Sequence, residues 1–563
     1  MYIKTTHSKD KDYIQIVESY REGDKVKHKV KLNLGRADEL ALNPSFVKLA
    51  ERLIEIAKLK PVDEKNDSNI DIRKSSEGEI KNWGWTVYKK IWNMFELNIL
   101  LKKIKKKKIK YDLNASVFLM CIQHLLNPAS KLALYENQND YINQPEIDLN
   151  HLYRSLDILC ENKTIIEKHL FEKNKTLFNM SVDIVFYDVT TFYFESFISD
   201  ELKKNGFSKD CKFKEVQVVL GLAIDIEGRP IGYELFPGNT NDGKTIDKIL
   251  ESLEEKFGIR NIIIVADRGI NSKINLKKIK DKKYGYIVAS RIKNIADEIK
   301  QKIFDSKDYT DINNKIKDNE ELNFKYKIIE YENILKEKII DEKTNEEKTI
   351  THTLKENLII TYSKKRADKD AADRLRLIEK AKNLLENQSQ IEAQSKRGGK
   401  KYLKKEKENQ CNWTLDNKLI EADKKFDGYY GIQTSEKNMT AQEIIEAYHK
   451  LWKIEESFRI MKSTLETRPI FHWTPKRIKG HFVVCFLSFL LERTLEYELK
   501  KNKIDASPEK IKKAINSMTF TKLEINGEIF LVKNKLAEYG SQILKVSKIP
   551  AMKNVSVLNE LVL

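Results

Sequence analysis

The sequence predicts an α/β protein with one mixed sheet at its centre. At Val182 helical spacing gives way to short β-branched and aromatic runs. The elements that follow come in the order strand, strand, strand, helix, strand, helix, strand. Further on, residues 441–466 predict a long amphipathic helix whose apolar stripe needs a partner surface. A chain of 563 residues is long enough to form this core and several further domains.

Each strand of the predicted sheet has a distinct run of side chains. VDIVFYDVTTFYF, starting at Val182, predicts a buried strand that ends near Asp188. VQVVLGLAID and RPIGYELF predict a hairpin, NIIIVAD a strand ending at Asp267, and YGYIVAS a further strand. This order is that of an RNase H-like sheet, so residues 181–290 are interpreted as the first part of an RNase H-like catalytic core.

The other regions are assigned from their hydrophobic period. Residues 1–75 predict a small N-terminal β sheet and a polar linker, and residues 76–180 a helical DNA-binding domain. Residues 291–425 predict a β-rich, lysine-rich insertion of four meandering strands and one helix. Residues 426–500 return to the core and carry the long helix, and residues 501–563 predict a C-terminal tail with one short hairpin.

Composition narrows the class of partner. Lys and Arg number 103 against 85 Asp and Glu, a net charge of +18 that suits a polyanion such as DNA. The five cysteines are scattered without a Cys-x-x-Cys pair, which argues against a disulfide framework and a zinc site and fits a reducing cytosol. The longest apolar run, 482–491, is too short for a bilayer span, so no membrane partner is expected.

Three acidic residues are candidates for one site. Asp188 and Asp267 are each expected at the end of a strand, where catalytic groups of α/β sheets collect, although an Asp there is also a common helix cap. Glu455 lies on the long helix, seven residues after Tyr448 and seven before Lys462, so these three share one helix edge. The alternative is a solvated flank with a Glu455–Arg459 pair. Three converging carboxylates would need a divalent cation, and oxygen ligands favour Mg²⁺ or Mn²⁺, here as two ions.

Several motifs resemble those of bacterial insertion-sequence DDE transposases. They are YDVTTFYFES, ELFPGNTNDGKT, IIIVADRGI and YHKLWKIEESFRIMKSTLETRPIFHW, which together cover residues 182–491 in pieces. The chain resembles the group whose last helix carries Tyr-x2-Arg-x3-Glu-x6-Lys. The resemblance implies Asp188, Asp267 and Glu455 as the metal-binding catalytic triad, with Tyr448 and Lys462 on the phosphates of the transposon ends.

The sequence departs from this signature at one position. Leu451 stands where the signature has Arg, so a guanidinium contact with phosphate is either missing or supplied elsewhere, with Arg459 as one candidate. Trp452 is a candidate for stacking on a displaced base, although a tryptophan beside a core stripe also packs. Arg268, directly after Asp267, is a further candidate for DNA contact.

Other functions compete with this interpretation. Residues 238–245 match the phosphate-binding motif Gly-x4-Gly-Lys-Thr, which predicts an ATPase or helicase. We rank it second because it leaves Asp188 and Glu455 without roles and because IGYELF is unlike a buried parallel strand. A phosphatase of the aspartyl type would need a second Asp where Thr190 stands. A transposase-derived protein that binds DNA without cutting it is the third alternative.

The expected activity is therefore metal-dependent cleavage and strand transfer at the ends of an insertion sequence, by cut-and-paste transposition. The expected partners are double-stranded transposon ends and target DNA, bound by a homodimer in the synaptic complex. The N-terminal 180 residues are expected to recognise the ends. The expected location is the bacterial cytoplasm, in association with the nucleoid.

Overall fold

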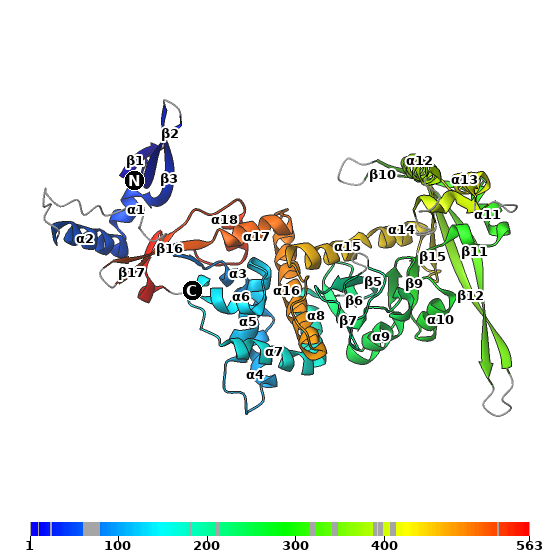
Figure 1. Cartoon of the computed structure of the whole chain (residues 1–563), viewed down its shortest axis with the longest axis horizontal. Coiled ribbons are helices and arrows are strands. Elements are labelled where there is room, and N and C mark those ends of the chain that lie inside the picture. The colour runs from blue at the N-terminus through cyan, green and yellow to red at the C-terminus, as the bar shows by residue number, and fades with distance from the viewer. Residues whose placement is uncertain are drawn as a thin grey trace.

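The structure is a computed structural model that places both termini in one half of an elongated molecule and a large sheet in the other (Figure 1). The predicted linker at 63–78 and the turn of the predicted hairpin at 526–527 lie outside the described residues. The structure describes residues 2–8, 11–22, 25–59, 79–180, 182–208, 214–315, 321–340, 347–386, 391, 398–405, 412–525 and 528–561.

The large sheet is a nine-stranded mixed sheet in the order β10-β11-β12-β15-β9-β8-β5-β6-β7. β5 (Ile184–Tyr193) pairs antiparallel with β6 (Gln217–Asp225) and parallel with β8 (Ile263–Ala266). β7 (Pro230–Pro237) pairs antiparallel with β6, and β9 (Gly285–Ala289) pairs parallel with β8. The predicted order of elements between 182 and 290, and the mixture of parallel and antiparallel pairing, are confirmed.

Helices cover both faces of this part of the sheet. α9 (Ile246–Glu251) and α10 (Lys273–Asp281) share one buried cluster with every second strand residue. α14 (Ala441–His449) and α15 (Trp452–Arg459) share the cluster on the opposite face, which includes Phe186 of β5. Because strand side chains alternate between faces, a residue's position in its strand decides which helices it meets.

The prediction of one continuous helix over 441–466 is wrong, because the chain forms three successive helical segments there. α14 ends at His449, and Lys453 N and Ile454 N donate to the carbonyls three residues earlier, at Lys450 and Leu451, which tightens the chain into a turn before α15. After α15 the turn Ile460–Thr464 is π-helical, so the helix is wide there and narrow near 450. The apolar stripe is still buried across all three segments: Ala447, Ile454 and Met461, one from each segment, all belong to the core.

The predicted insertion extends the sheet itself. β11 (Glu321–Ile340) and β12 (Glu347–Tyr362) pair from Lys325 to Ile340 of β11 along all of β12, as one long two-stranded ribbon, so the prediction of four separate strands is wrong. The root of β12 pairs with β15 (Tyr429–Thr434), which pairs antiparallel with β9. The far part of the ribbon projects away from the body (Figure 1). β10 (Thr310–Lys315) borders β11 at the edge of the sheet.

The middle of the molecule is helical and is built around the long helix α16 (Pro475–Lys501). α16 packs against α5 and α7 so closely that a side chain at Gly480 would collide with the carbonyl of Leu156. The helices before the sheet are α3 (Trp85–Met94), α4 (Leu97–Ile104), α5 (Leu113–Leu126), α6 (Lys131–Asn137), α7 (Leu149–Glu161) and α8 (Lys163–Phe178).

The chain's two ends pack together, so the prediction of residues 501–563 as a tail is wrong. β16 and β17 form the predicted hairpin, and their sheet also includes β4 from the other end of the chain. The predicted N-terminal sheet of β1–β3 is confirmed. The elements are β1 (Tyr2–Ser8), β2 (Lys11–Glu22), β3 (Lys25–Arg36), α1 (Ala37–Ala41), α2 (Pro44–Leu59), β4 (Ile80–Asn82), α17 (Pro508–Asn516), β16 (Thr519–Ile525), β17 (Glu528–Lys533), α18 (Gly540–Val546) and β18 (Val555–Val557).

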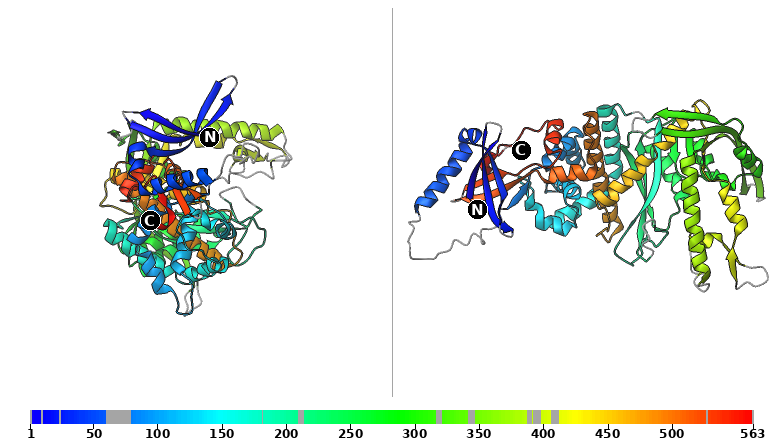
Figure 2. Two further views of the ribbon diagram at one scale, coloured as in Figure 1. Left: turned by 90° about the vertical axis from the view of Figure 1, so that its left-hand side faces the viewer. Right: turned by 90° about the horizontal axis from the view of Figure 1, so that it is seen from above.

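The remaining elements lie around the insertion and include its one predicted helix, which is α12. Figure 2 shows this region at the end of the molecule opposite the N-terminus. The elements around the insertion are α11 (Asp297–Phe304), α12 (Lys364–Glu386), β13 (Leu403–Lys405), β14 (Trp413–Leu415) and α13 (Asn417–Lys424).

Within the described residues no single helix is long and apolar enough to cross a membrane. One bent pair of helices, Leu113–Leu126 with Lys131–Asp140, has the length and composition of a span when the two are taken together.

Candidate active site

Asp188 lies inside a strand. The prediction that its strand ends there is wrong, because β6 pairs with β5 as far as Tyr193. Asp188 is half-buried, and by alternation its side chain faces the same layer as Phe186 and Phe192, which belong to the cluster under α14 and α15. The first predicted carboxylate therefore faces the helices that carry the third.

Asp267 comes directly after β8, as predicted, and is exposed. The parallel register pairs Tyr187 with Ala266, so Asp188 and Asp267 occupy the next position on neighbouring strands. The carboxylate of Asp267 accepts a hydrogen bond from the backbone N–H of Gly269 at 2.6 Å, which holds it in the turn. A side chain at Gly269 would press on the carboxylate of Asp242, which places a further acidic group beside this turn.

Glu455 is exposed on α15, which packs on β5. The residues on either side of it hold the helix in place. Lys453 Nζ donates to the carbonyl of Ile226 at 2.6 Å, and Glu456 accepts from buried Arg493 at 3.1 Å. Glu456 is therefore occupied in a structural ion pair, whereas Glu455 faces open space.

The alternative of a solvated Glu455–Arg459 pair is not what the structure shows. Arg459 lies 3.7 Å from Glu456 instead, with 67% of its side chain exposed. It is not among the residues that line the hollow next to Glu455. Arg459 is thus a weak substitute for the arginine absent at Leu451.

Tyr448 and Arg268 meet at one aromatic side chain, Tyr430 of β15. The hydroxyls of Tyr430 and Tyr448 are 2.7 Å apart, and the guanidinium carbon of Arg268 lies 5.4 Å from the centre of the Tyr430 ring. Burial raises the pKa of Tyr448, and the neighbouring Tyr430 and Asp267 raise it further. Tyr448 is therefore a neutral hydrogen-bonding group close to Asp267.

Trp452 and Glu455 line one hollow of about 1000 Å³ together with Tyr448 and Leu451. Trp452 is 51% exposed, so it is not packed into the core. Lys462 lies in the π-helical turn, 5.6 Å from the ring centre of Phe192 on β5. The hollow thus brings together Tyr448, Trp452 and Glu455 from the predicted set, while Lys462 lies along β5.

The donors suit a divalent ion in kind, since all three predicted ligands are carboxylates. Among the described residues, no three His, Cys, Asp or Glu side chains lie close enough together to hold a metal ion. The strand register brings Asp188 and Asp267 to neighbouring strands, and α15, which carries Glu455, packs on β5.

The competing phosphate-binding motif at 238–245 does not form a phosphate cradle. β7, which precedes it, is an antiparallel edge strand. The Thr245 hydroxyl is fully buried, accepts from Tyr187 at 2.7 Å and donates to the carbonyl of Asp242 at 2.6 Å. A hydroxyl bound in this way does not face a nucleotide-bound metal ion, so the ATPase alternative is wrong for this loop.

The profile described as "Transposase DDE domain" matches residues 182–491, more than half of the chain. The protein is a DDE transposase. The profile of the IS1634 family transposase N-terminal domain also matches, over residues 3–64. The transposase is accordingly a phosphoryl-transfer enzyme of DNA transposition, in a family that uses divalent metal ions.

The transposase is similar to transposases of known structure at low identity. A piggyBac transposase synaptic complex with hairpin DNA matches at 8% identity with a TM-score of 0.36, over 77% of this chain and 80% of that one. A Mos1 paired-end complex with the left transposon end matches at 12% identity with a TM-score of 0.15, over 32% and 60%. A pre-cleavage Mos1 transpososome matches at 12% identity and 0.14, over 32% and 61%. No curated protein sequence matches the transposase.

Sequence reasoning missed two residues of this region. Arg366, at the start of α12, lies 4.4 Å from the ring centre of Tyr430 and lines the same hollow as Glu455. Both residues stand in segments that the sequence marks only as insertion and returning strand, KKRADKD and DGYYGIQTS. No local signal links two segments so far apart in the chain, because β12 and β15 bring them together.

Proposed function

We propose that this transposase moves its insertion sequence by cut-and-paste transposition, with Asp188, Asp267 and Glu455 as the catalytic triad of an RNase H-like core. The observation that carries the proposal is the register of β5 and β8. Asp188 and Asp267 each follow a residue of the Tyr187–Ala266 pair, and α15, which carries Glu455, packs on β5. The strand order β7-β6-β5-β8-β9 supports the RNase H-like assignment.

Each of the three carboxylates is held in position by a different part of the fold. Asp267 is held by the Gly269 N–H, Asp188 is supported by a strand paired on both edges, and Glu455 is carried by a helix tied down on both sides of it. Two Mg²⁺ or Mn²⁺ ions held by the three would neutralise their charges and provide an activated water. Cleavage at the transposon ends and joining of the freed 3′-hydroxyl to target DNA would then share one site.

The DNA contacts proposed around this site come from α14, α15 and the turn after β8. Tyr448 would donate its hydrogen bond to a phosphate, and Arg268 and Lys462 would provide positive charge. Trp452, half-exposed in the hollow, is placed for stacking on a displaced base. Arg459 would contact DNA from the exposed side of α15.

Recognition of the transposon ends is assigned to residues 1–180, which include the N-terminal sheet and the helical domain. The lysine run between Lys102 and Lys110 supports this assignment, because most of its side chains are exposed at the end of α4. We propose that two copies pair on two ends in the synaptic complex. The proposed setting is the bacterial cytoplasm, on nucleoid DNA.

The test is cleavage of a duplex that carries the element's own terminal inverted repeat, in the presence of Mg²⁺. Asp188→Asn, Asp267→Asn and Glu455→Gln should each lower cleavage at least about a hundredfold while end binding persists. Chelation of the metal should have the same effect. Glu446→Gln is the matched control, because Glu446 lines the same hollow and is exposed.

Two results would contradict the proposal. Cleavage by Glu455→Gln at the wild-type rate would remove Glu455 from the triad. Binding of ends by the wild type without nicking or strand transfer would favour the alternative of a DNA-binding protein that no longer cuts.

A further inference from the structure

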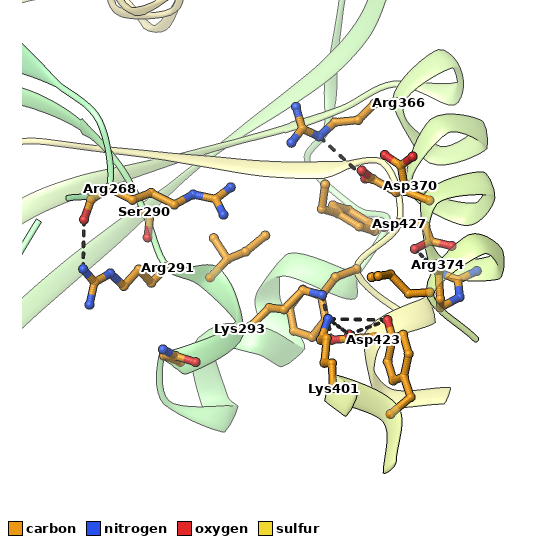
Figure 3. A pocket seen from close by; sticks show the side chains of 17 residues that line it. Arg268, Ser290, Arg291, Lys293, Arg366, Asp370, Arg374, Lys401, Asp423 and Asp427 are labelled. Atoms are coloured by element: carbon orange, nitrogen blue, oxygen red, sulfur yellow. Dashed lines mark hydrogen bonds and ion pairs between the residues drawn. The ribbon is translucent and has the colours of Figure 1, made fainter. Parts of the chain in front are cut away.

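A second hollow, of about 480 Å³, lies next to the one that contains Glu455. Its walls come from the core strand ends, from α12 and from the loop before β15, and Figure 3 shows these side chains. Arg366 lines both hollows, so it stands on the boundary between them. Arg268, directly after Asp267, lines the second hollow. The boundary is thus beside the proposed catalytic site.

The cations that line the second hollow differ in how closely they are paired with carboxylates. On its far side Lys293 and Lys401 both contact Asp423, and Arg374 pairs with Asp427. These three cations face two carboxylates, so most of their charge is balanced where they stand. This side of the hollow therefore offers a ligand less positive charge than the side next to Asp267.

The cations on the catalytic side lack such close partners. Among the described residues, Arg268 and Arg291 have no carboxylate within ion-pair distance, and Arg291 donates to the carbonyl of Arg268 at 2.9 Å. Arg366 has a longer contact, 3.6 Å from Asp370, and its buried Nε makes no hydrogen bond in the structure. Surplus positive charge therefore gathers next to Asp267.

The ring of Tyr430 organises this charge. Arg366 lies 4.4 Å and Arg268 5.4 Å from its centre, so one aromatic ring holds two guanidinium groups. A guanidinium stacked on a ring keeps its N–H groups in its own plane, where they can bind two oxygens of a phosphate. Tyr430 is fixed in turn by its hydroxyl contact of 2.7 Å with Tyr448.

We propose that Arg366, Arg268 and the ring of Tyr430 form a binding site for one backbone phosphate of the DNA strand that is cut. Arg366 would then supply, from the insertion, the guanidinium that the long helix lacks at Leu451. Leu451 lines the hollow but offers only an apolar side chain. This inference rests on the proposed function, since it places the phosphate by reference to Glu455 and Asp267.

The test compares variants of one helix in the full-length protein. Arg366→Ala should lower the slope of log K against log salt by about one for a duplex that carries the terminal inverted repeat, because one phosphate contact is lost. It should also lower cleavage roughly ten- to a hundredfold. Arg376→Ala is the control, since Arg376 is on the same helix, 76% exposed and paired with Asp373 at 3.5 Å.

Two further variants separate binding from folding. Arg366→Lys keeps the charge but loses the planar fork, so it should retain the salt slope and lose part of the cleavage rate. Tyr430→Phe should behave more like the wild type than Tyr430→Ala does, because it keeps the ring under both guanidiniums. Melting temperatures close to that of the wild type would show that the variants are folded.

The outcomes distinguish this inference from the proposed function. An unchanged salt slope and an unchanged cleavage rate in Arg366→Ala would overturn the phosphate site and leave the catalytic triad standing. Equal losses in Arg366→Ala and Arg376→Ala would overturn it as well. Failure of the triad would appear separately, as cleavage by Glu455→Gln.

Discussion

At the residue scale, the neighbours of a side chain decide which of two similar groups is available for chemistry. Glu455 and Glu456 are adjacent in the chain, yet Glu456 pairs with Arg493 at 3.1 Å whereas Glu455 lines an open hollow. Spacing along the helix predicts Glu455 as the site residue, and the packing leaves Glu455 accessible: the side chain of Glu456 turns toward Arg493 of α16, and that of Glu455 lines the hollow.

The loop at 238–245 leads to a prediction at this scale. Lys244→Ala should leave strand transfer within about twofold of the wild type, because Lys244 is exposed and Thr245 is buried against Tyr187. Thr245→Val should instead lower the free energy of unfolding by about 1–3 kcal/mol, because the Tyr187 hydroxyl loses its acceptor. Strand-transfer assays and denaturant unfolding measure the two effects. A nucleotide dependence that disappears with Lys244 would contradict this account.

At the scale of elements, the insertion and the core are joined by shared strands. β12 pairs with β15, and at this joint Glu356 accepts hydrogen bonds from Tyr286 and Gln433. Burial raises the pKa of Glu356 from 4.5 to about 7, against the lowering effect of those bonds. The position of Arg366 beside Tyr430 depends on the same joint, since Tyr430 is opposite Thr361 in this pairing.

Glu356 makes the stability of this joint depend on pH. The folded chain holds the Glu356 proton more tightly than the unfolded chain does, so its contribution is fully present below about pH 4.5 and is lost as the pH rises through about 7. The loss amounts to at most about 3 kcal/mol. The melting temperature of the wild type should therefore fall more between pH 5 and pH 8, roughly the range set by this pKa, than that of Glu356→Gln.

The control for this prediction is Glu330→Gln on the exposed side of β11. Its melting temperature should follow that of the wild type at both values of pH. A pH dependence that is the same in Glu356→Gln and in the wild type would assign the effect to other groups.

At the scale of the whole molecule, the two ends of the chain lie together and the large sheet lies in the other half (Figure 1). β4, at residues 80–82, pairs with β16, and the cluster of Leu34, Leu40 and Leu49 packs on the strands near the C-terminus. The proposed end-recognition region is thus held to the core through α16 and the C-terminal elements. Removal of residues 501–563 would expose this shared core, so these residues are integral to the fold.

The net charge of +18 leads to a prediction about assembly. Two free copies repel each other, and two transposon ends would neutralise both and hold them together. We expect a monomer at low salt without DNA and a complex of two chains with two end duplexes, measured as mass by light scattering or sedimentation. A stable dimer without DNA would contradict this expectation, and addition of an unrelated duplex is the control.

The sequence by itself determined the identity of the family and the order of the elements in the core, and its spacing makes Glu455 a candidate site residue. These features are local, because hydrophobic period and residue spacing act within one strand or helix. It misplaced the end of β5, since the run DVTTFY continues a strand only when β6 is beside it. It also divided one ribbon into four strands, because the pairing of β11 with β12 overrides the charged residues within them.

Only the tertiary structure decided which cations stand beside the carboxylates. Arg268, Arg366 and Tyr430 come from segments about 100 and 60 residues apart, and the pairing of β12 with β15 and of β15 with β9 unites them. Such pairing depends on long-range contacts that carry no local pattern. The three candidate carboxylates can therefore be identified along the chain, whereas the residues around them are brought together only when the sheet is assembled.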